Sequence, residues 1–173
     1  MLDDTICHFV PIEDYWDEAK LFFQEEKNNL LKILDNFSVS IEHFGGSSIP
    51  GSLTKRDVDI QIRTQNKDFL QVVEKIKYYA DIKRKDLWTE NLALFKNDSK
   101  TFPVDYIITT NGSEAEQYYF GGRDLLLKDP KLLIEYNNLK KSFEGKQYKN
   151  YREAKTNFWR KTLKEKLGLK NVH

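Results

Sequence analysis

Residues 44–60 join a small polar turn to two closely spaced carboxylates, and no other segment of the chain is better suited to chemistry. The turn consists of Gly45, Gly46, Ser47 and Ser48. Turns of this kind can hold a phosphate on their backbone amides. The carboxylates that follow, Asp57 and Asp59, could hold a divalent metal ion beside that phosphate. Nucleotidyl transfer needs a phosphate site and a metal site next to each other, so these residues predict that chemistry.

The spacing of Asp57 and Asp59 suits a shared metal site, because alternate residues of a strand lie on the same face of a sheet. Two residues of strand rise separate their Cα atoms by roughly 6.5–7 Å, so both carboxylates can approach one or two ions. Without a cation the two charges would repel each other and raise the pKa of one of them, a conflict that Mg²⁺ would remove. The alternative is an ordinary half-exposed strand, in which polar residues also alternate with apolar ones.

Asp105 is a third candidate carboxylate, within the apolar segment 102–109. An ionised carboxylate among apolar neighbours is costly unless it is paired or binds a metal. We therefore expect Asp105 to ligate a metal ion or to accept the proton of an attacking hydroxyl. The alternative is a salt bridge to a lysine or arginine, or exposure at a sheet edge. Pro103 suggests that a strand starts here or lies at an edge.

Several basic residues are candidates for contacts with phosphate. Lys55 lies two residues before Asp57 and could neutralise a phosphate, although a surface lysine would look the same in the sequence. His43 precedes the turn and could touch a phosphate or simply pack within its strand. A possible anion-binding cluster, with structural ion pairs as the alternative, consists of Arg123, Arg152 and Lys155.

Hydrophobic periodicity predicts an α+β fold, a small mixed β-sheet flanked by helices and followed by a C-terminal helical unit. The predicted helices cover residues 14–34, 66–78 and 150–167, and the predicted strands cover 39–44, 58–62, 92–95 and 102–109. Asp14 is the expected N-cap of the first helix. Helix breaks are expected at Gly121-Gly122, Asp129-Pro130 and Gly145. Residues 1–113 would form an α/β core and 114–173 a helical unit packed on it, or both would form one domain.

Composition limits the class of protein. The chain has 173 residues, of which 39% are hydrophobic, enough for a proper core, and its apolar runs are too short to span a membrane. The single cysteine, Cys7, excludes an internal disulfide and a cysteine-based zinc cluster. The first residues are acidic and lack the order of a secretory signal, so a cytoplasmic location is expected.

Charge is unevenly distributed along the chain. Residues 1–35 contain 9 Asp and Glu against 3 Lys and Arg, whereas residues 140–173 contain 11 Lys and Arg against 3 Asp and Glu. The basic C-terminal segment could help to hold an anionic substrate or a nucleic acid. It could equally be a solvated helix face that pairs with the acidic first helix.

Taken together, the turn and the carboxylates resemble the DNA polymerase β-like nucleotidyltransferase superfamily. That pattern is a hydrophobic residue, Gly and Gly or Ser, about ten residues, and then two carboxylates that alternate with hydrophobic residues. Here it is matched by Phe44-Gly45-Gly46, ten residues over 47–56, and Asp57-Val58-Asp59-Ile60. Asp105 would be the third carboxylate of the pattern.

A closer resemblance, over about residues 39–160, is to the GrpB family, which is assigned to that superfamily. Its glycine-serine block is matched by His43 to Gly51, and its following lysine and aspartate by Lys55 and Asp59-Ile60. Its C-terminal run is matched within 120–130 by Arg123 and Asp124, and later by Tyr136, Leu139, Lys140, Tyr151, Arg152, Lys155 and Phe158. The chain departs from many family members at Gly46, where they have Ser, at Asp57, where they lack a carboxylate, and at Asp105, where they have His.

The resemblance implies an Mg²⁺-dependent nucleotidyltransferase that moves an NMP from an NTP to a hydroxyl. Asp57, Asp59 and Asp105 would hold two Mg²⁺ ions, with Mn²⁺ as a substitute. The β- and γ-phosphates would be held by Gly45, Gly46, Ser47 and Ser48, with Lys55 beside them. The acceptor is left open among a small molecule, an RNA and a protein. The alternatives are a non-catalytic module of the same fold that binds a nucleotide or RNA, and a protein-interaction partner that docks through its helical tail.

Overall fold

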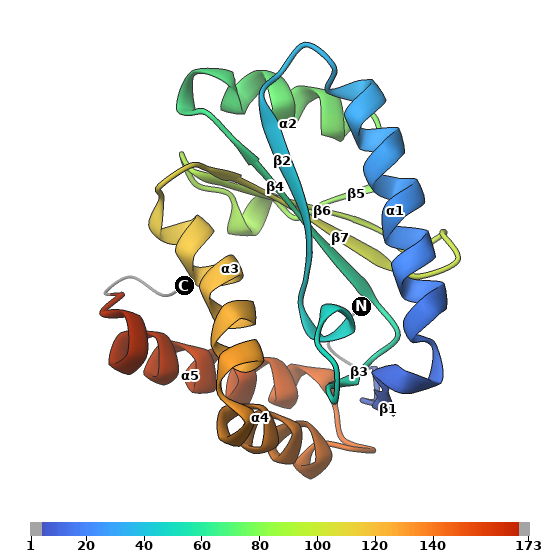
Figure 1. Cartoon of the computed structure of the whole chain (residues 1–173), viewed down its shortest axis with the longest axis vertical. Coiled ribbons are helices and arrows are strands. Elements are labelled where there is room, and N and C mark those ends of the chain that lie inside the picture. Colours follow the sequence, from blue (N-terminus) through green and yellow to red (C-terminus); the bar gives the residue numbers. More distant parts are fainter. Residues whose placement is uncertain (1–4, 170–173) are drawn as a thin grey trace.

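A five-stranded mixed sheet forms the centre of the protein, in a computed structural model that describes residues 5–169 (Figure 1). The strands are β2 (Val39–Phe44), β4 (Val58–Thr64), β5 (Ile82–Lys83), β6 (Leu92–Asn97) and β7 (Val104–Thr110). Their order in the sheet is β2-β4-β7-β6-β5, in which β4 and β7 are parallel and the other neighbours are antiparallel. The two strands that carry the candidate carboxylates are therefore direct neighbours.

Residues 5–169 also form five α-helices. They are α1 (Trp16–Ile33), α2 (Phe69–Lys77), α3 (Glu114–Lys128), α4 (Pro130–Ser142) and α5 (Tyr148–Leu167). In Figure 1, α1 and α2 lie along the sheet, while α3, α4 and α5 gather together at its other side. A short two-stranded sheet pairs β1 (Val10–Pro11) with β3 (Leu53–Thr54), and the 3-10 helix η2 (Gly46–Ser48) lies between β2 and β3.

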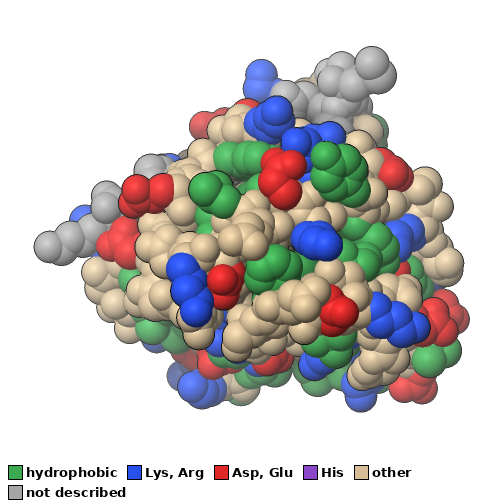
Figure 2. All heavy atoms as spheres, turned by 90° about the horizontal axis from the view of Figure 1, so that it is seen from above, with side chains coloured by type: hydrophobic (Ala, Val, Ile, Leu, Met, Phe, Trp, Pro, Cys, Tyr) green, Lys and Arg blue, Asp and Glu red, His purple; other side chains and the backbone are tan. Residues whose placement is uncertain are grey.

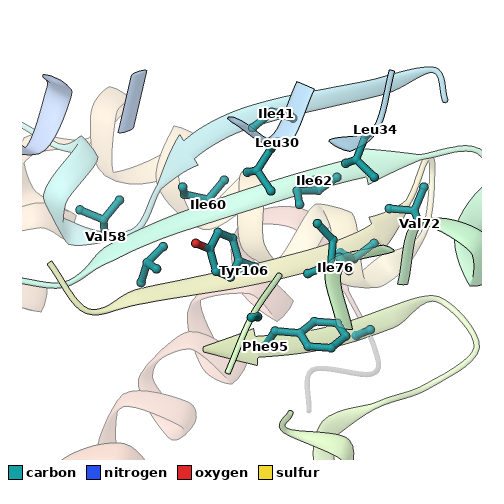
Figure 3. Packing of buried hydrophobic residues seen from close by; sticks show 14 of the residues in the cluster. Leu30, Leu34, Ile41, Val58, Ile60, Ile62, Val72, Ile76, Phe95 and Tyr106 are labelled. Carbon is teal, nitrogen blue, oxygen red and sulfur yellow. The ribbon is translucent and has the colours of Figure 1, made fainter. Parts of the chain in front are cut away.

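The main hydrophobic core fills the space between one face of the sheet and the helices α1 and α2 (Figure 3). The alternating positions of β4 and β7 that point into it are Val58, Ile60, Ile62, Val104, Tyr106 and Ile108, all fully buried. Leu30 and Leu34, at the end of α1, and Val72 and Ile76 of α2 cover them. Because side chains alternate along a strand, the residues between these positions, Asp59 and Asp105 among them, belong to the opposite face.

That opposite face is only partly covered by hydrophobic side chains. Phe44, Leu92 and Ile107 pack there with Ala115 and Tyr119 of α3. The C-terminal helices have a further cluster of their own, which consists of Leu126, Leu132, Tyr136, Trp159, Leu163 and Leu169 together with Ile49 from the segment after η2. The helical unit thus packs directly against the segment that follows the glycine turn.

These elements confirm the predicted α+β fold with a mixed sheet and C-terminal helices. The predicted break at Asp129-Pro130 is also confirmed, because α3 ends and α4 begins there. Asp129 caps α4, since its carboxylate accepts hydrogen bonds from the backbone amides of Lys131 and Leu132, at 3.1 and 3.2 Å. Pro130 occupies the first turn, where its missing amide hydrogen costs no hydrogen bond.

The predicted helix break at Gly121-Gly122 is wrong, because α3 continues through both glycines. A Cβ on Gly121 would lie 2.6 Å from Leu167, and one on Gly122 would lie 3.4 Å from the Trp159 ring. The glycines therefore serve close packing of α5 against α3, and this contact outweighs their low helix propensity.

The predicted cap of the first helix is also wrong, and Pro103 matches one of its two interpretations. Asp14 does not cap the first helix, because it ends the 3-10 helix η1 (Ile12–Asp14) and α1 begins at Trp16 without a side-chain cap. Buried Ile12 anchors that extra turn in the core and so shifts the start of α1. Pro103 precedes the first residue of β7, as expected for a strand start, but β7 lies between β4 and β6 and is not an edge strand.

Figure 2 looks onto the end of the molecule that α2 and the α1–β2 connection form. Acidic and basic side chains are interspersed there with hydrophobic ones. Leu70 of α2 and Tyr78, directly after it, are largely exposed. Within residues 5–169, no helix is both long and apolar enough to cross a membrane.

Candidate functional site

The three predicted carboxylates come together where β4 and β7 run side by side. Asp59 and Asp105 are register partners in this parallel pair, and Asp57 directly precedes the first residue of β4. Neighbouring strands lie about 4.8 Å apart, so the Asp59 and Asp105 side chains leave the sheet next to each other. Burial, together with the charges of Asp57 and Asp105, raises the pKa of Asp59 from its ordinary 3.8 to about 7. The fold thus brings Asp57 and Asp105 close enough to Asp59 for their charges to affect its ionisation.

Gly45 allows the Asp59 carboxylate to lie against the turn. A Cβ at this position would overlap Asp59 Oδ2, and the backbone of Gly45 has a φ of +71°, in the left-handed region. Both features require glycine here. The register that pairs Phe44 with Asp59 brings the end of β2, and hence the turn, to the carboxylates.

The hydroxyls of the two serines in the turn are used inside the protein. Ser47 is buried, and its Oγ lies 3.0 Å from Nε2 of His43. Ser48 donates its hydroxyl to the carbonyl oxygen of Gly45 at 2.9 Å. Contacts between this turn and a phosphate would therefore come from backbone amides at the start of η2, where the first amides of a helix have no partner within it.

His43 packs within the protein, which confirms the second of the two roles considered for it. Its ring stacks on Phe23 with the centroids 5.0 Å apart, and burial, with the charge of Arg123, lowers its pKa to about 4. A neutral imidazole at pH 7 supplies no charge for a phosphate, so His43 holds Ser47 in place.

Lys55 lies within the site and not on an open surface. Its Nζ is 2.6 Å from Asp57 Oδ2 and 5.0 Å from the centroid of the Tyr148 ring. Burial would raise the pKa of Asp57, but the Lys55 ammonium outweighs it and lowers that pKa below its ordinary value. Asp57 is therefore ionised at neutral pH and already paired.

Lys96 is a residue of the site that the sequence analysis missed. In the register of β6 with β7 it lies directly opposite Asp105. Its Nζ is 3.5 Å from Asp105 Oδ1 and 3.3 Å from Asp98 Oδ1. Burial raises the pKa of Asp105, and Lys96 opposes this effect. The salt bridge proposed as an alternative for Asp105 thus exists, although Oδ1 is buried and makes no hydrogen bond.

The C-terminal helices bring two further lysines to the turn and the carboxylates. Burial alone would lower the pKa of Lys155, in α5, but Tyr136, Tyr151 and Tyr148 and, to a smaller extent, Asp59 raise it well above its ordinary value. Lys140 of α4 is buried and donates to the carbonyl oxygen of Leu53 at 2.6 Å and to Ser52 Oγ at 3.2 Å.

The predicted cluster of Arg123, Arg152 and Lys155 is not a single group. Arg123 donates to the carbonyl oxygen of His43 at 2.8 Å and lies over the Phe120 ring, 4.4 Å from its centroid. It supports the end of β2, whereas Lys155 faces the carboxylates and Arg152 is exposed. Register and burial identify Lys96 and Lys140, which sequence reasoning missed, and the only signal for Lys140 was its place in the family resemblance. Lys155 was already a candidate for anion binding.

The three aspartates offer the oxygen ligands that a divalent metal ion prefers, but their side chains are not arranged around a common point. Within residues 5–169, no three His, Cys, Asp or Glu side chains converge closely enough to hold a metal ion. Two of the three carboxylates face lysines instead, Asp57 at 2.6 Å and Asp105 at 3.5 Å. The mutual repulsion at Asp59 and the buried Oδ1 of Asp105 without a hydrogen bond are features that a hard cation with oxygen ligands would relieve.

Comparison with known proteins identifies the family. The family model described as GrpB protein matches residues 9–165. A UPF0157 protein of Vibrio cholerae is 31% identical over 164 residues, which cover 94% of this chain and 85% of that protein. The crystal structure of the conserved protein GrpB from Enterococcus faecalis covers 88% of this chain and 89% of its own, with a TM-score of 0.64 and 16% identity, and so has the same fold. The Cid1 poly(U) polymerase bound to MgGTP covers 72% of this chain and 41% of its own at a TM-score of 0.47 and 12% identity, too low to carry functional weight. The chain belongs to the GrpB family.

Proposed function

We propose that this protein is a metal-dependent nucleotidyltransferase that moves an NMP from an NTP to a hydroxyl acceptor. The observation that carries the proposal is the register of β4 with β7, which sets Asp59 beside Asp105 next to a glycine turn. Asp57, two residues before Asp59, completes a set of three carboxylates.

Each group has a role in this reaction. Asp57, Asp59 and Asp105 would hold Mg²⁺, or Mn²⁺ in its place, and the metal would neutralise charge on the triphosphate when bound. Backbone amides of the turn and the ammonium groups of Lys55 and Lys155 would hold the β- and γ-phosphates. Positioning and charge neutralisation would then supply most of the rate acceleration.

The transfer step is a substitution at the α-phosphorus. The acceptor hydroxyl oxygen forms a bond to that phosphorus, the bond to the bridging oxygen of the β-phosphate breaks, and pyrophosphate leaves. The hydroxyl proton passes to Asp105, whose pKa is raised by burial and which is therefore a better base than an exposed aspartate.

Calorimetric titration of each NTP tests the proposal, with and without Mg²⁺, in the wild type and in Asp57→Asn/Asp59→Asn. We expect binding that needs Mg²⁺ and is lost in the double variant, whose neutral amides keep the shape of the carboxylates. Asp35→Asn, at an exposed aspartate just beyond α1 and outside the three, is the control and should still bind. Binding of NTPs that is equal in the wild type and the double variant would refute the metal site.

A second function is favoured by the two lysines that already neutralise Asp57 and Asp105. With its carboxylates paired in this way, the same fold could bind a nucleotide or RNA without metal and without transfer. Binding in the presence of EDTA that weakens steeply as salt is raised would identify this function.

A further inference from the structure

Lys55 and Lys96 occupy equivalent places at the candidate site. Each ammonium group faces one of the carboxylates, Asp57 at 2.6 Å and Asp105 at 3.5 Å. Each also has a second partner outside that set of carboxylates. For Lys55 it is the ring of Tyr148, and for Lys96 it is Asp98.

We propose that Lys55 and Lys96 are exchangeable internal counter-ions, which neutralise Asp57 and Asp105 until a divalent cation displaces them toward Tyr148 and Asp98. The inference deepens the proposed function, because it rests on the metal site of that function. According to this inference, Lys55 and Lys96 lower the affinity of the site for a divalent cation until they are displaced.

The contacts of Lys96 favour such an exchange. Its ammonium is slightly nearer to Asp98, at 3.3 Å, than to Asp105, at 3.5 Å. Oδ1 of Asp105 receives no hydrogen bond from it, so the ion pair leaves this buried oxygen unsatisfied. The Asp98 side chain is 42% exposed, against 30% for Asp105, and can hold a lysine at the edge of the site. Lys96 can therefore turn fully to Asp98 and still keep an ion pair.

Lys55 makes the stronger of the two pairs. Its contact with Asp57 is short, at 2.6 Å, and about a third of the lysine side chain remains exposed. The centroid of the Tyr148 ring lies 5.0 Å from its Nζ, within the range of a cation–π interaction. A lysine has a flexible stem of four carbons, so its ammonium can move toward the ring without a change in the backbone.

Electrostatics makes the lysines and a divalent cation mutually exclusive. A divalent cation among the carboxylates would lie a few ångströms from two ammonium groups, and like charges at such distances repel strongly in a partly buried site. The metal alone should therefore bind weakly. A triphosphate that brings negative oxygens would offer the displaced ammonium groups new partners, so metal and nucleotide should each strengthen the binding of the other.

The test is the affinity for Mn²⁺ alone, measured by calorimetry and by electron paramagnetic resonance on the full chain without nucleotide. Removal of the competing ammonium in Lys96→Met should tighten Mn²⁺ binding about three- to tenfold. Lys83→Met is the matched control, since Lys83 is exposed on neighbouring β5 and pairs with Phe95, on the opposite face from Lys96. It makes the same change in net charge and should alter the affinity less than about twofold.

Further variants separate the possible outcomes. Lys96→Gln keeps a polar side chain and should also tighten Mn²⁺ binding, which guards against a folding defect of Lys96→Met. Adding Asp59→Asn to Lys96→Met should abolish the gain. An affinity for Mn²⁺ that is unchanged or weaker in both Lys96 variants would overturn the inference, and so would a gain that survives Asp59→Asn.

The outcome also distinguishes this inference from the proposed function. Tighter Mn²⁺ binding in the Lys96 variants without NTP binding by any form of the protein would support the exchange and refute nucleotidyl transfer. Mg²⁺-dependent NTP binding combined with unchanged Mn²⁺ affinity in these variants would support the proposed function and overturn the exchange.

Discussion

Replacement of Asp59 by asparagine should stabilise the protein at pH 8 and have little effect near pH 4. Burial and the charges of Asp57 and Asp105 raise the pKa of Asp59 from 3.8 to about 7. Between these pH values the folded protein binds more protons than the unfolded chain, so the free energy of unfolding falls as the pH rises. Above pH 7 the full penalty is present, and Asp59→Asn removes it without a change in shape.

The size of the effect follows from the same pKa values. A rise from 3.8 to about 7 corresponds to roughly 4 kcal/mol, at about 1.4 kcal/mol per pH unit. This is an upper limit, because Asp59 is only partly buried, so water screens its repulsion by Asp57 and Asp105. We therefore expect Asp59→Asn to be more stable than the wild type by about 1–2 kcal/mol at pH 8.

Urea unfolding at pH 4.5, 6 and 8 in EDTA, followed by circular dichroism, measures this difference. Asp35→Asn, at an exposed aspartate just beyond α1, controls for the loss of one negative charge. The difference between Asp59→Asn and the wild type should grow from pH 4.5 to pH 8. A difference that does not change with pH, or that grows on acidification, would refute the argument that three carboxylates repel each other at this site.

Two further substitutions test how the turn is held in place. Gly45→Ala should destabilise the protein by about 2–4 kcal/mol in thermal unfolding, because its Cβ would overlap the Asp59 carboxylate at a positive φ. Gly112→Ala has a similar φ of +77° but open space around it, so a loss as large as that of Gly45→Ala would contradict the steric explanation. Lys140→Met should lower the free energy of unfolding in urea by about 1–3 kcal/mol, because it removes the ammonium that donates to the carbonyl oxygen of Leu53 and to buried Ser52 Oγ. Exposed Lys141→Met is its control, and equal effects of the two would count against a structural role for the buried lysine.

Local patterns predicted most of the elements correctly. The strand over residues 39–44 coincides with β2, and the other predicted strands and helices coincide with observed elements to within a few residues at each end. The errors arose where tertiary contacts outweigh local preference. Gly121 and Gly122 are poor helix formers, yet α3 continues through them because α5 packs against their bare backbone.

For the candidate site, the sequence determined the carboxylates and the turn but not the groups that surround them. Asp57 and Asp59 share a short alternating segment, and the glycine turn lies ten residues before them, so chain geometry alone places these parts near one another. Asp105 was a candidate from the chemical cost of a carboxylate in an apolar strand. That it lies directly beside Asp59 is a consequence of the parallel pairing of β4 with β7.

Only the tertiary structure shows which lysine side chains lie near these carboxylates. Lys96 reaches Asp105 through the register of two antiparallel strands, and Lys140 and Lys155 come from helices more than eighty residues after the turn. No local pattern distinguishes these lysines from the many exposed ones, because their burial depends on how the C-terminal helices pack against the segment that follows the turn. The sequence alone thus predicted a site for a metal ion and a phosphate with Lys55 beside it, and the fold paired Lys55 with Asp57 and added Lys96 opposite Asp105.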